Sequence, residues 1–425
     1  MERLFLKEAS TATRISYYHL LAFLASLPFD FFYSHLILIS FCLHTLIQLN
    51  FKAVKPVFTL NNLALQSVFL VTMVSTIYAV NRPQAFNEWG KHITILLFPL
   101  LFCLTSFNVR RYRDQLLFGF SVVCTLVICF LYLDALRNIS YYGLPMSYLL
   151  SSAFTNHNFA LPIDMHATFF SLQVAIALIF MLSAILKEHN RNWRLFEILC
   201  SSILLAGLVQ LSSKSVFVPT VILIIVAVPL FLLKGKKRLG FIMVASSVSI
   251  IALAGIFATK SLRTRYVSAL SYDLALTTKN QRFDSRLDRW RSAFGLIEKS
   301  PAIGYGAGSE LALLHDDFYT RRYYNSFINY LNAHNQYLSF WLKSGIWGLS
   351  IYLATLTFGF RQALKNKDLL FFSFMVLITA VSFVENLLDV DKGVIFYAFF
   401  FSFFFYSGWP VDRVRRETQN VASLA

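Results

Sequence analysis

The side chains best suited to chemistry lie in one polar stretch, residues 259–343, and His334 stands near its end, followed directly by Asn335. An imidazole titrates near neutral pH and can accept a proton from a hydroxyl group. A single histidine is more often structural, so its position alone leaves this role open.

A group of four closely spaced arginines lies upstream of the histidine, at residues 282–291. Ser285 and Asp288 have the spacing of a capping box, which predicts a helix over residues 286–299. The apolar side chains of this helix form one stripe, and most of the arginines fall on another face. The stripe comprises Leu287, Trp290, Phe294 and Ile297, and the arginines are Arg282, Arg286, Arg289 and Arg291.

Alternating glycines follow, in the sequence Pro301-Ala-Ile-Gly304-Tyr-Gly306-Ala-Gly308. Backbone without side chains can bring N–H groups close to an anion. A tight turn is the commoner reason for such a pattern. There is no Walker lysine pattern and no preceding strand, so the glycines do not predict a nucleotide site.

The composition points to a lipid environment. The 425 residues are 57% hydrophobic and 14% charged, with 44 Phe and a net charge of +16, whereas soluble domains have about 45–50% apolar and about 25% charged residues. These values argue against a soluble enzyme and a disordered basic protein. A nucleic-acid binder would explain the sign of the charge but not the hydrophobicity.

Twelve apolar runs predict transmembrane helices, since a span needs roughly 20 residues, with a range of about 17–25. They cover residues 15–31, 34–49, 61–80, 90–107, 115–136, 164–186, 195–212, 215–233, 239–258, 336–360, 369–387 and 393–410. The fold class is therefore all-α, a polytopic integral membrane protein. The first two runs are short, so a hairpin of tilted helices fits them as well as two full spans.

Lys and Arg in short loops predict which loops face the cytoplasm. With the N-terminus inside, the cytoplasmic segments hold 21 of the 38 basic residues, and the short outer connections hold five. The other 12 lie in the outer segment 259–343, beside seven acidic residues. The sequence thus predicts cytoplasmic termini and one large periplasmic loop, between spans nine and ten.

This pattern divides the chain into four parts. They are residues 1–258 with spans one to nine, residues 259–335 as a periplasmic loop domain with the amphipathic helix, residues 336–410 with spans 10–12, and residues 411–425 as a cytoplasmic tail. All five cysteines lie within apolar runs, where we expect neither disulfides nor metal ligands, and no cleaved signal peptide is predicted.

Two motifs in residues 285–348 resemble the O-antigen ligase/polymerase superfamily, bacterial membrane glycosyltransferases that use undecaprenyl-diphosphate-linked glycans. One is His334-Asn335, nine residues, then Gly345-x-x-Gly348. The other is Ser285-Arg286-Leu-Asp-Arg289-Trp290 followed by Pro301-Ala-Ile-Gly304-Tyr-Gly306. The family often has an arginine at the outer junction of spans seven and eight. Here Lys214 stands there, which keeps the charge and loses the bidentate fork.

The resemblance implies a GT-C-like fold and transfer of a glycan from a lipid diphosphate to a sugar hydroxyl, at the periplasmic face of the inner membrane. His334 would accept the hydroxyl proton, while Arg286 and Lys214 would neutralise charge on the leaving diphosphate. Substrate-binding candidates are Arg289, Arg282, Asn335, Gly304, Gly306 and Arg291. The sequence shows no Asp-rich metal motif, so we expect no metal and no cofactor.

The acceptor cannot be read from the sequence. A ligase would use lipid A–core, a polymerase another lipid-linked repeat, and a protein O-glycosylation ligase a protein. One dominant outer loop favours the ligase, because polymerases often have two. A non-enzymatic lipid-glycan transporter or flippase also fits twelve spans, although the two halves of this chain look unlike. The expected partners are the lipid-linked donor, a glycan acceptor and membrane lipids, with no nucleic acid.

Overall fold

The computed structural model describes residues 6, 9–49, 57–259, 263–268, 271 and 284–408. These residues form helices and turns, and no strand occurs among them. The longer helices are α1 (Thr11–Ser26), α2 (Phe31–Ile47), α3 (Leu60–Thr76), α4 (Arg82–Leu104), α5 (Val109–Tyr141), α7 (Ala167–Ile185), α8 (Arg191–Leu211), α11 (Gly235–Ala258), α17 (Gln336–Lys365), α18 (Leu369–Ser382) and α19 (Asp391–Gly408). Shorter helices are α6 (His157–Ala160), α9 (Lys214–Ile222), α10 (Val228–Leu232), α14 (Arg286–Ile297), α15 (Glu310–Arg321) and α16 (Tyr324–Ile328).

The all-α prediction is confirmed for these residues, and each of the twelve predicted runs contains helix. The count of twelve spans is not confirmed. Five helices are long and apolar enough to cross a membrane, namely 109–141, 167–185, 191–211, 214–232 and 235–255. Three further apolar helices are shorter, at Phe32–Ile47, Leu60–Thr76 and Leu369–Ser382. Some of the other helices are short, whereas α4 and α17, with 23 and 30 residues, are long enough but not apolar enough.

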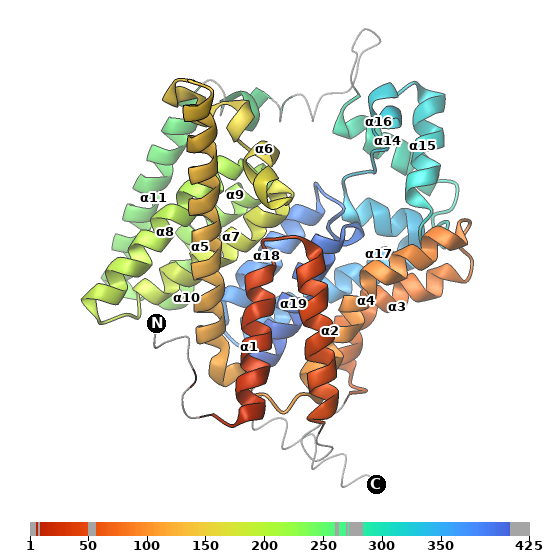
Figure 1. Cartoon of the computed structure of the whole chain (residues 1–425). Coiled ribbons are helices and arrows are strands. Elements are labelled where there is room, and N and C mark those ends of the chain that lie inside the picture. Colours follow the sequence, from red (N-terminus) through yellow and green to blue (C-terminus); the bar gives the residue numbers. More distant parts are fainter. Residues whose placement is uncertain are drawn as a thin grey trace.

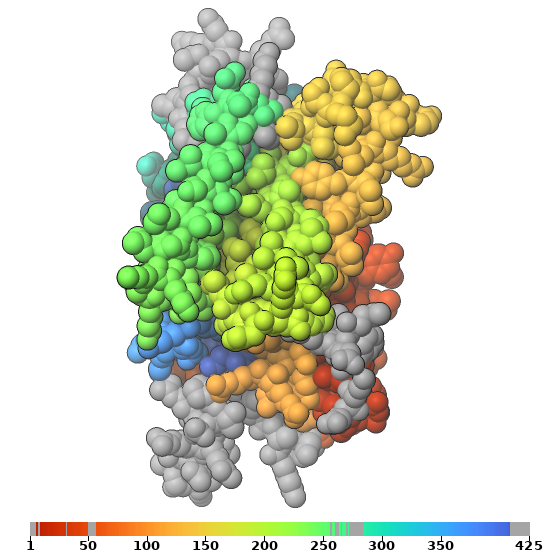
Figure 2. Space-filling view, turned by 90° about the vertical axis from the view of Figure 1, so that its left-hand side faces the viewer, coloured from red at the N-terminus to blue at the C-terminus, as the bar shows by residue number. Residues whose placement is uncertain are grey.

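The outermost helix, α11, is the one most suited to face lipid. Only 6% of its apolar window is buried inside the protein, and its exposed side chains include Met243, Ile250 and Ile251. In Figure 2 it lies in green along the edge of the molecule, beside α8 and α9. Since an exposed apolar face of this kind is costly in water, it supports a membrane environment.

The core of the bundle is built on the Phe-rich helix α19. This helix packs against α4, α5 and α18, and its phenylalanines, including Phe399, Phe400 and Phe404, are fully buried. Phe374 of α18 lies 5.8 Å from Phe404 and 6.2 Å from Phe400 between ring centroids. Aromatic side chains therefore fill much of the centre of the bundle.

Helices α14, α15 and α16 form a small layer at one end of the bundle, above α17 (Figure 1). They share a separate apolar core with α17, made by Leu296, Leu314, Phe318, Leu338 and Leu342. The predicted capping box begins α14, because Ser285 and Asp288 each bond to the other's backbone N–H. The predicted stripe is partly confirmed, since Ile297 is buried whereas Phe294 is 44% exposed.

Helix α17 bends at Gly345, where φ is +62°. The turn after Pro301 occupies the bend, because the N–H of Ile346 donates to the carbonyl of Pro301 at 3.0 Å. A Cβ at Gly345 would lie 2.1 Å from the carbonyl oxygen of Ala302. The turn that begins at Pro301 therefore packs against the Gly345-x-x-Gly348 motif, and this contact fixes the outer layer on α17.

Candidate functional site

His334 lies directly before α17 and is held against the turn between α18 and α19. Its backbone has φ +48°, in the left-handed region. Its Nδ1 lies 2.9 Å from Oε2 of Glu385, and the two side chains are 26% and 18% exposed. Its Nε2 makes no hydrogen bond to any residue that the structure describes. The imidazole thus has one occupied nitrogen and one available nitrogen.

The Glu385 carboxylate determines what this imidazole can do. Burial alone would raise the pKa of Glu385, but the hydrogen bond and charge of His334, with smaller effects from His166 and Arg286, bring it below its usual value. An ionised carboxylate only accepts hydrogen bonds, so Nδ1 of His334 carries the proton. In the neutral imidazole Nε2 is then the acceptor nitrogen, as a general base requires.

Arg286 is the first residue of α14, and its charge reaches Glu385. Its Nε is buried and has no hydrogen-bond acceptor among the described residues. The capping box immediately before it fixes where this helix begins. Arg286 therefore brings a positive charge and an unsatisfied donor to the neighbourhood of the His334–Glu385 pair.

The other predicted arginines differ in exposure where the structure describes them. Arg289, one turn further along α14, is only 7% exposed, whereas Arg291 is exposed. Arg282 lies outside the described residues. Substrate binding by these three residues stays a prediction.

Lys214 begins α9, and its neighbours link it to the same end of the bundle. Oγ of Ser213 lies 3.3 Å from Oγ1 of Thr168, at the start of α7. The N–H of Thr168 donates to Nδ1 of His166 at 3.3 Å, and the charge of His166 reaches Glu385. Lys214 therefore lies at the end of the bundle that carries His334.

The candidate glycines have a packing role in this structure. The N–H of Gly304 donates to the carbonyl of Ser300, and that of Gly306 to the carbonyl of Lys343. Their φ values are +76° and +89°, and a Cβ at Gly306 would lie 2.2 Å from Cα of Ala79. Both amides are thus already bonded, so the geometry supports the tight-turn explanation. Anion binding by these glycines stays a prediction that no contact here supports.

Asn335 also has a structural contact. Its Oδ1 accepts hydrogen bonds from the N–H groups of Tyr337 and Leu338 at 3.0 and 3.1 Å, which caps α17. This cap orients the first turn of the helix directly after His334. The role of Asn335 in substrate binding is untested.

Sequence reasoning missed the role of the turn after α18. In the sequence alone, Glu385, Asp389, Asp391 and Lys392 indicate a structural cap or a topology signal, and nothing marks Asn386. The structure places Glu385 on His334 and bonds Oδ1 of Asn386 to the N–H of Asn335 at 2.7 Å. The signal that could have indicated this was an acidic group at an outer span end, the same end that carries His334.

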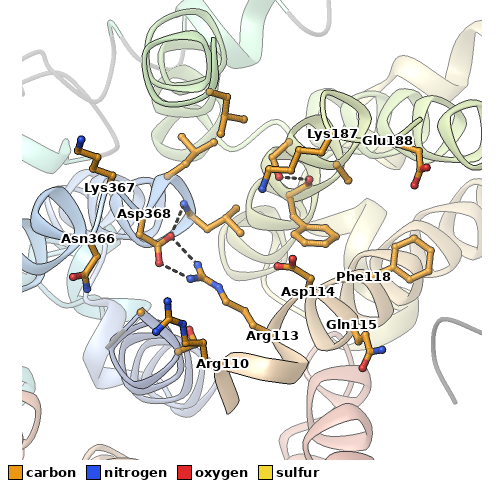
Figure 3. A pocket seen from close by; sticks show the side chains of 18 of the residues that line it. Arg110, Arg113, Asp114, Gln115, Phe118, Lys187, Glu188, Asn366, Lys367 and Asp368 are labelled. Atoms are coloured by element: carbon orange, nitrogen blue, oxygen red, sulfur yellow. Dashed lines mark hydrogen bonds and ion pairs between the residues drawn. The ribbon is translucent and has the colours of Figure 1, made fainter. Parts of the chain in front are cut away.

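A cavity lies at the opposite end of the bundle from His334 and does not belong to this site. It has a volume of about 660 Å³, and Figure 3 shows Arg113 paired with Asp368 in its wall. Its charged lining residues are Arg110, Arg113, Lys187 and Lys367 together with Asp114, Glu188, Glu197 and Asp368. Because these charges balance, the cavity does not indicate a site for a diphosphate.

Among the described residues, no three His, Cys, Asp or Glu side chains are grouped so that they could hold a metal ion. The five cysteines are free thiols, of which Cys103, Cys124 and Cys200 are buried. The polar groups available at the site are therefore an imidazole, a carboxylate and basic side chains. These groups suit proton transfer and the stabilisation of an anion.

Two comparisons with known proteins bear on this site. An uncharacterized protein of Haemophilus influenzae is 27% identical over 154 residues, which is 34% of this chain and 39% of that relative's length. Residues 199–353 match the family model described as O-antigen ligase. The match includes Lys214, Arg286 and His334 but ends before Glu385. The match of residues 199–353 to this family model confirms the resemblance to the O-antigen ligase/polymerase superfamily.

Proposed function

We propose that this protein transfers a glycan from an undecaprenyl-diphosphate carrier to a sugar hydroxyl of lipid A–core, at the periplasmic face of the bacterial inner membrane. The observation that carries the proposal is the His334–Glu385 pair, 2.9 Å between Nδ1 and Oε2, beside a domain that matches the O-antigen ligase family. A hydroxyl group is a weak nucleophile until a base takes its proton, and this pair leaves Nε2 available to do so.

The bond changes are those of a single displacement. The acceptor oxygen attacks the anomeric carbon, the bond from that carbon to the diphosphate oxygen breaks, and Nε2 of His334 takes the hydroxyl proton. Direct attack inverts the anomeric configuration. The diphosphate linkage itself supplies the driving force, so the reaction needs no nucleotide.

The leaving group needs positive charge as its bond breaks, because charge builds on the phosphate oxygens. In this proposal Arg286 and Lys214 supply it, with Arg289 as a further contributor. The buried Nε of Arg286 supports this role, since it has no acceptor among the described residues and a phosphate oxygen would satisfy it. We expect transfer without a metal ion.

Two related activities use the same chemistry and differ only in the acceptor. A polymerase would transfer the glycan to another lipid-linked repeat, and a protein O-glycosylation ligase would transfer it to a protein. The outer layer of α14, α15 and α16 sits on one helix, α17. As the largest outer layer among the described residues, it favours the ligase, because the polymerases often carry two large outer loops.

The test is an incubation of the purified protein with lipid-linked glycan and lipid A–core, in chelator and without ATP. A new glycolipid is the expected result. Longer lipid-linked chains would instead identify a polymerase. The absence of any glycan product would favour the transporter, and recovery of transfer only after divalent metal is added would contradict the metal-free reaction.

A further inference from the structure

A buried polar cluster lies beneath His334 and joins four parts of the chain. We call it the Lys343 cluster; its members are Lys343, Glu88, Glu310, Asn386 and Asp389. Nζ of Lys343 lies 3.1 Å from Oε1 of Glu88, 2.8 Å from Oδ1 of Asp389 and 4.0 Å from Oε2 of Glu310. The cluster thus connects α4, α15, α17 and the turn after α18.

Two members of the cluster reach the peptide groups on either side of His334. Oε1 of Glu310 accepts the N–H of Ala333 at 3.1 Å, and Oδ1 of Asn386 accepts the N–H of Asn335 at 2.7 Å. Nδ2 of Asn386 donates to Oε1 of Glu310 at 2.9 Å. The N–H groups of both neighbours of His334 are therefore bound by two side chains, Glu310 and Asn386, that are hydrogen-bonded to each other.

The side-chain contact of His334 also connects it to the Lys343 cluster, through the turn after α18. Glu385, which holds the imidazole, directly precedes Asn386. Asn386 also donates to Oδ2 of Asp389 at 2.8 Å, which ties that turn to Lys343. The backbone and the side chain of His334 are thus held by the same turn.

His334 needs such support because its φ of +48° lies in the left-handed region. This conformation costs a non-glycine residue free energy and persists only where the surrounding structure imposes it. Without the bonds to Ala333 and Asn335, the backbone can relax and move the imidazole. A displacement of about 1 Å can cost roughly 100-fold in rate.

Four of the five cluster members are too deeply buried to touch a substrate, and the side chain of Asp389 is 17% exposed. Exposed fractions are 2% for Lys343, 3% for Asn386, 4% for Glu310 and 8% for Glu88. Burial, and next the charge of Asp389, raise the pKa of Glu310. Burial would also raise the pKa of Asp389, but Lys343 brings it below its usual value. The cluster therefore acts through other residues.

We propose that Glu310 and Asn386 are positioning residues for His334, and that the Lys343 cluster sets where Nε2 of the imidazole stands relative to the acceptor hydroxyl. This inference rests on the proposed function, because positioning affects rate only if His334 takes part in transfer.

The test is a double-mutant cycle between Asn386→Ala and His334→Ala, with kcat and KM for the lipid-linked donor measured over long incubations. In the wild-type background, Asn386→Ala lowers kcat by about 10- to 100-fold and changes KM by less than about threefold. In the His334→Ala background it causes no further loss, because the residue that it positions is absent.

A conservative variant distinguishes a positioning role of Glu310 from a general effect of its substitution on folding. Glu310→Gln keeps an oxygen that accepts the N–H of Ala333, so it retains more transfer than Glu310→Ala. If Asn386→Ala does not accumulate as folded protein, the comparison of Glu310→Gln with Glu310→Ala tests the positioning role instead. Equal kcat for the two Glu310 variants would then overturn the inference.

Asn62→Ala is the matched control. Asn62 is 2% exposed, donates to the carbonyl of Val57 and to Sγ of Cys103, and accepts from Tyr406 near the other end of α19. This variant loses stability while keeping kcat.

Two results would overturn the inference. One is an equal loss of kcat from Asn386→Ala in both backgrounds, and the other is a comparable loss of kcat from Asn62→Ala. Failure of the proposed function gives other results, in which wild-type protein makes no product or His334→Ala transfers glycan at the full wild-type rate.

Discussion

At the residue scale, the account depends on one histidine and the carboxylate that orients it. The sequence predicted His334 from its position and from a family motif. Its partner lies 51 residues further along the chain, at 2.9 Å, and no local pattern indicates such a contact. Glu385 can therefore be identified as the partner of His334 only from the structure, because the packing of α18 against α17 brings the pair together.

The depressed pKa of Glu385 predicts a stability difference at acid pH. A carboxyl whose pKa is lower in the folded state adds stability above its unfolded pKa, about 4.3, and this stability is lost as the pH falls through the lower folded value. We expect Glu385→Gln to be less stable than wild type at pH 7, and the gap to narrow below about pH 4. Thermal unfolding of the purified proteins between pH 7 and 3 measures this.

Glu298→Gln is the control for that experiment, because Glu298 is exposed on the same outer layer. Its unfolding temperature should follow wild type at every pH. A constant gap between Glu385→Gln and wild type across the range would contradict the ionised pair.

Lys214 gives a second prediction at this scale. If its charge neutralises the leaving diphosphate, Lys214→Arg retains most transfer, whereas Lys214→Ala loses about 10- to 100-fold, the range for a hydrogen bond to a charged group. Initial rates of glycan transfer distinguish the two. Lys236→Ala, an exposed lysine of α11, controls for loss of a positive charge. Equal rates for the two Lys214 variants would remove the residue from the mechanism.

At the element scale, the bend of α17 and the turn after Pro301 form one joint. These motifs are about 40 residues apart in the sequence, which leaves both a tight turn and anion binding open for the glycines. In the structure, Gly345 makes room for the turn, and the amides of Gly304 and Gly306 bond to carbonyl oxygens. The joint sets the position of α14, which carries Arg286, relative to the helix that follows His334.

Gly345→Ala should therefore loosen the whole outer layer. The backbone of Gly345, at φ +62° and ψ −165°, is essentially restricted to glycine and costs alanine roughly 1–3 kcal/mol. The Cβ would also overlap the carbonyl of Ala302. We expect a lower unfolding temperature and a loss of transfer, measured on protein that still inserts in the membrane. Gly255→Ala in α11 is the matched control, since a Cβ there meets nothing within 4 Å.

For that control we expect a gain of about 0.5–1 kcal/mol, because alanine favours a helix interior more than glycine does. If Gly345→Ala proves as stable and active as Gly255→Ala, the joint does not position the site.

At the scale of the whole molecule, the two ends of the bundle differ in kind. The His334 site lies at one end, with the layer of α14, α15 and α16 (Figure 1). The cavity at the other end brings together Arg110, Lys187 and Lys367, which come from three basic clusters that the sequence predicted on one side of the membrane. Charge patterning thus predicted which segments share a side.

Other features at this scale could not be predicted from the sequence. The number of full spans is one of them, since twelve apolar runs predict twelve spans whereas five described helices are long and apolar enough to cross a membrane. The Lys343 cluster was also invisible, since Glu88 and Asp389 each look like ordinary loop or helix-end carboxylates. Only the long-range packing that buries them beside one lysine gives them a role.

The predicted orientation can be tested with introduced cysteines. Tyr319→Cys lies on the outer layer and Lys187→Cys at the opposite end, and both positions are exposed. A membrane-impermeant maleimide should label the first in intact spheroplasts and the second only after lysis. The native protein gives the background, because its cysteines are buried or half-buried. The reverse labelling pattern would contradict periplasmic placement of the site.

The central claim is that His334 takes the proton of the acceptor hydroxyl, and single-turnover transfer tests it most directly. Purified wild-type protein and His334→Ala are loaded with lipid-linked glycan, acceptor is added in excess, and glycosylated acceptor is followed over time. The account predicts that His334→Ala inserts and binds donor as wild type does, yet transfers about 100- to 10,000-fold more slowly, the usual contribution of a general base. Transfer by a folded His334→Ala protein at the wild-type rate would contradict it.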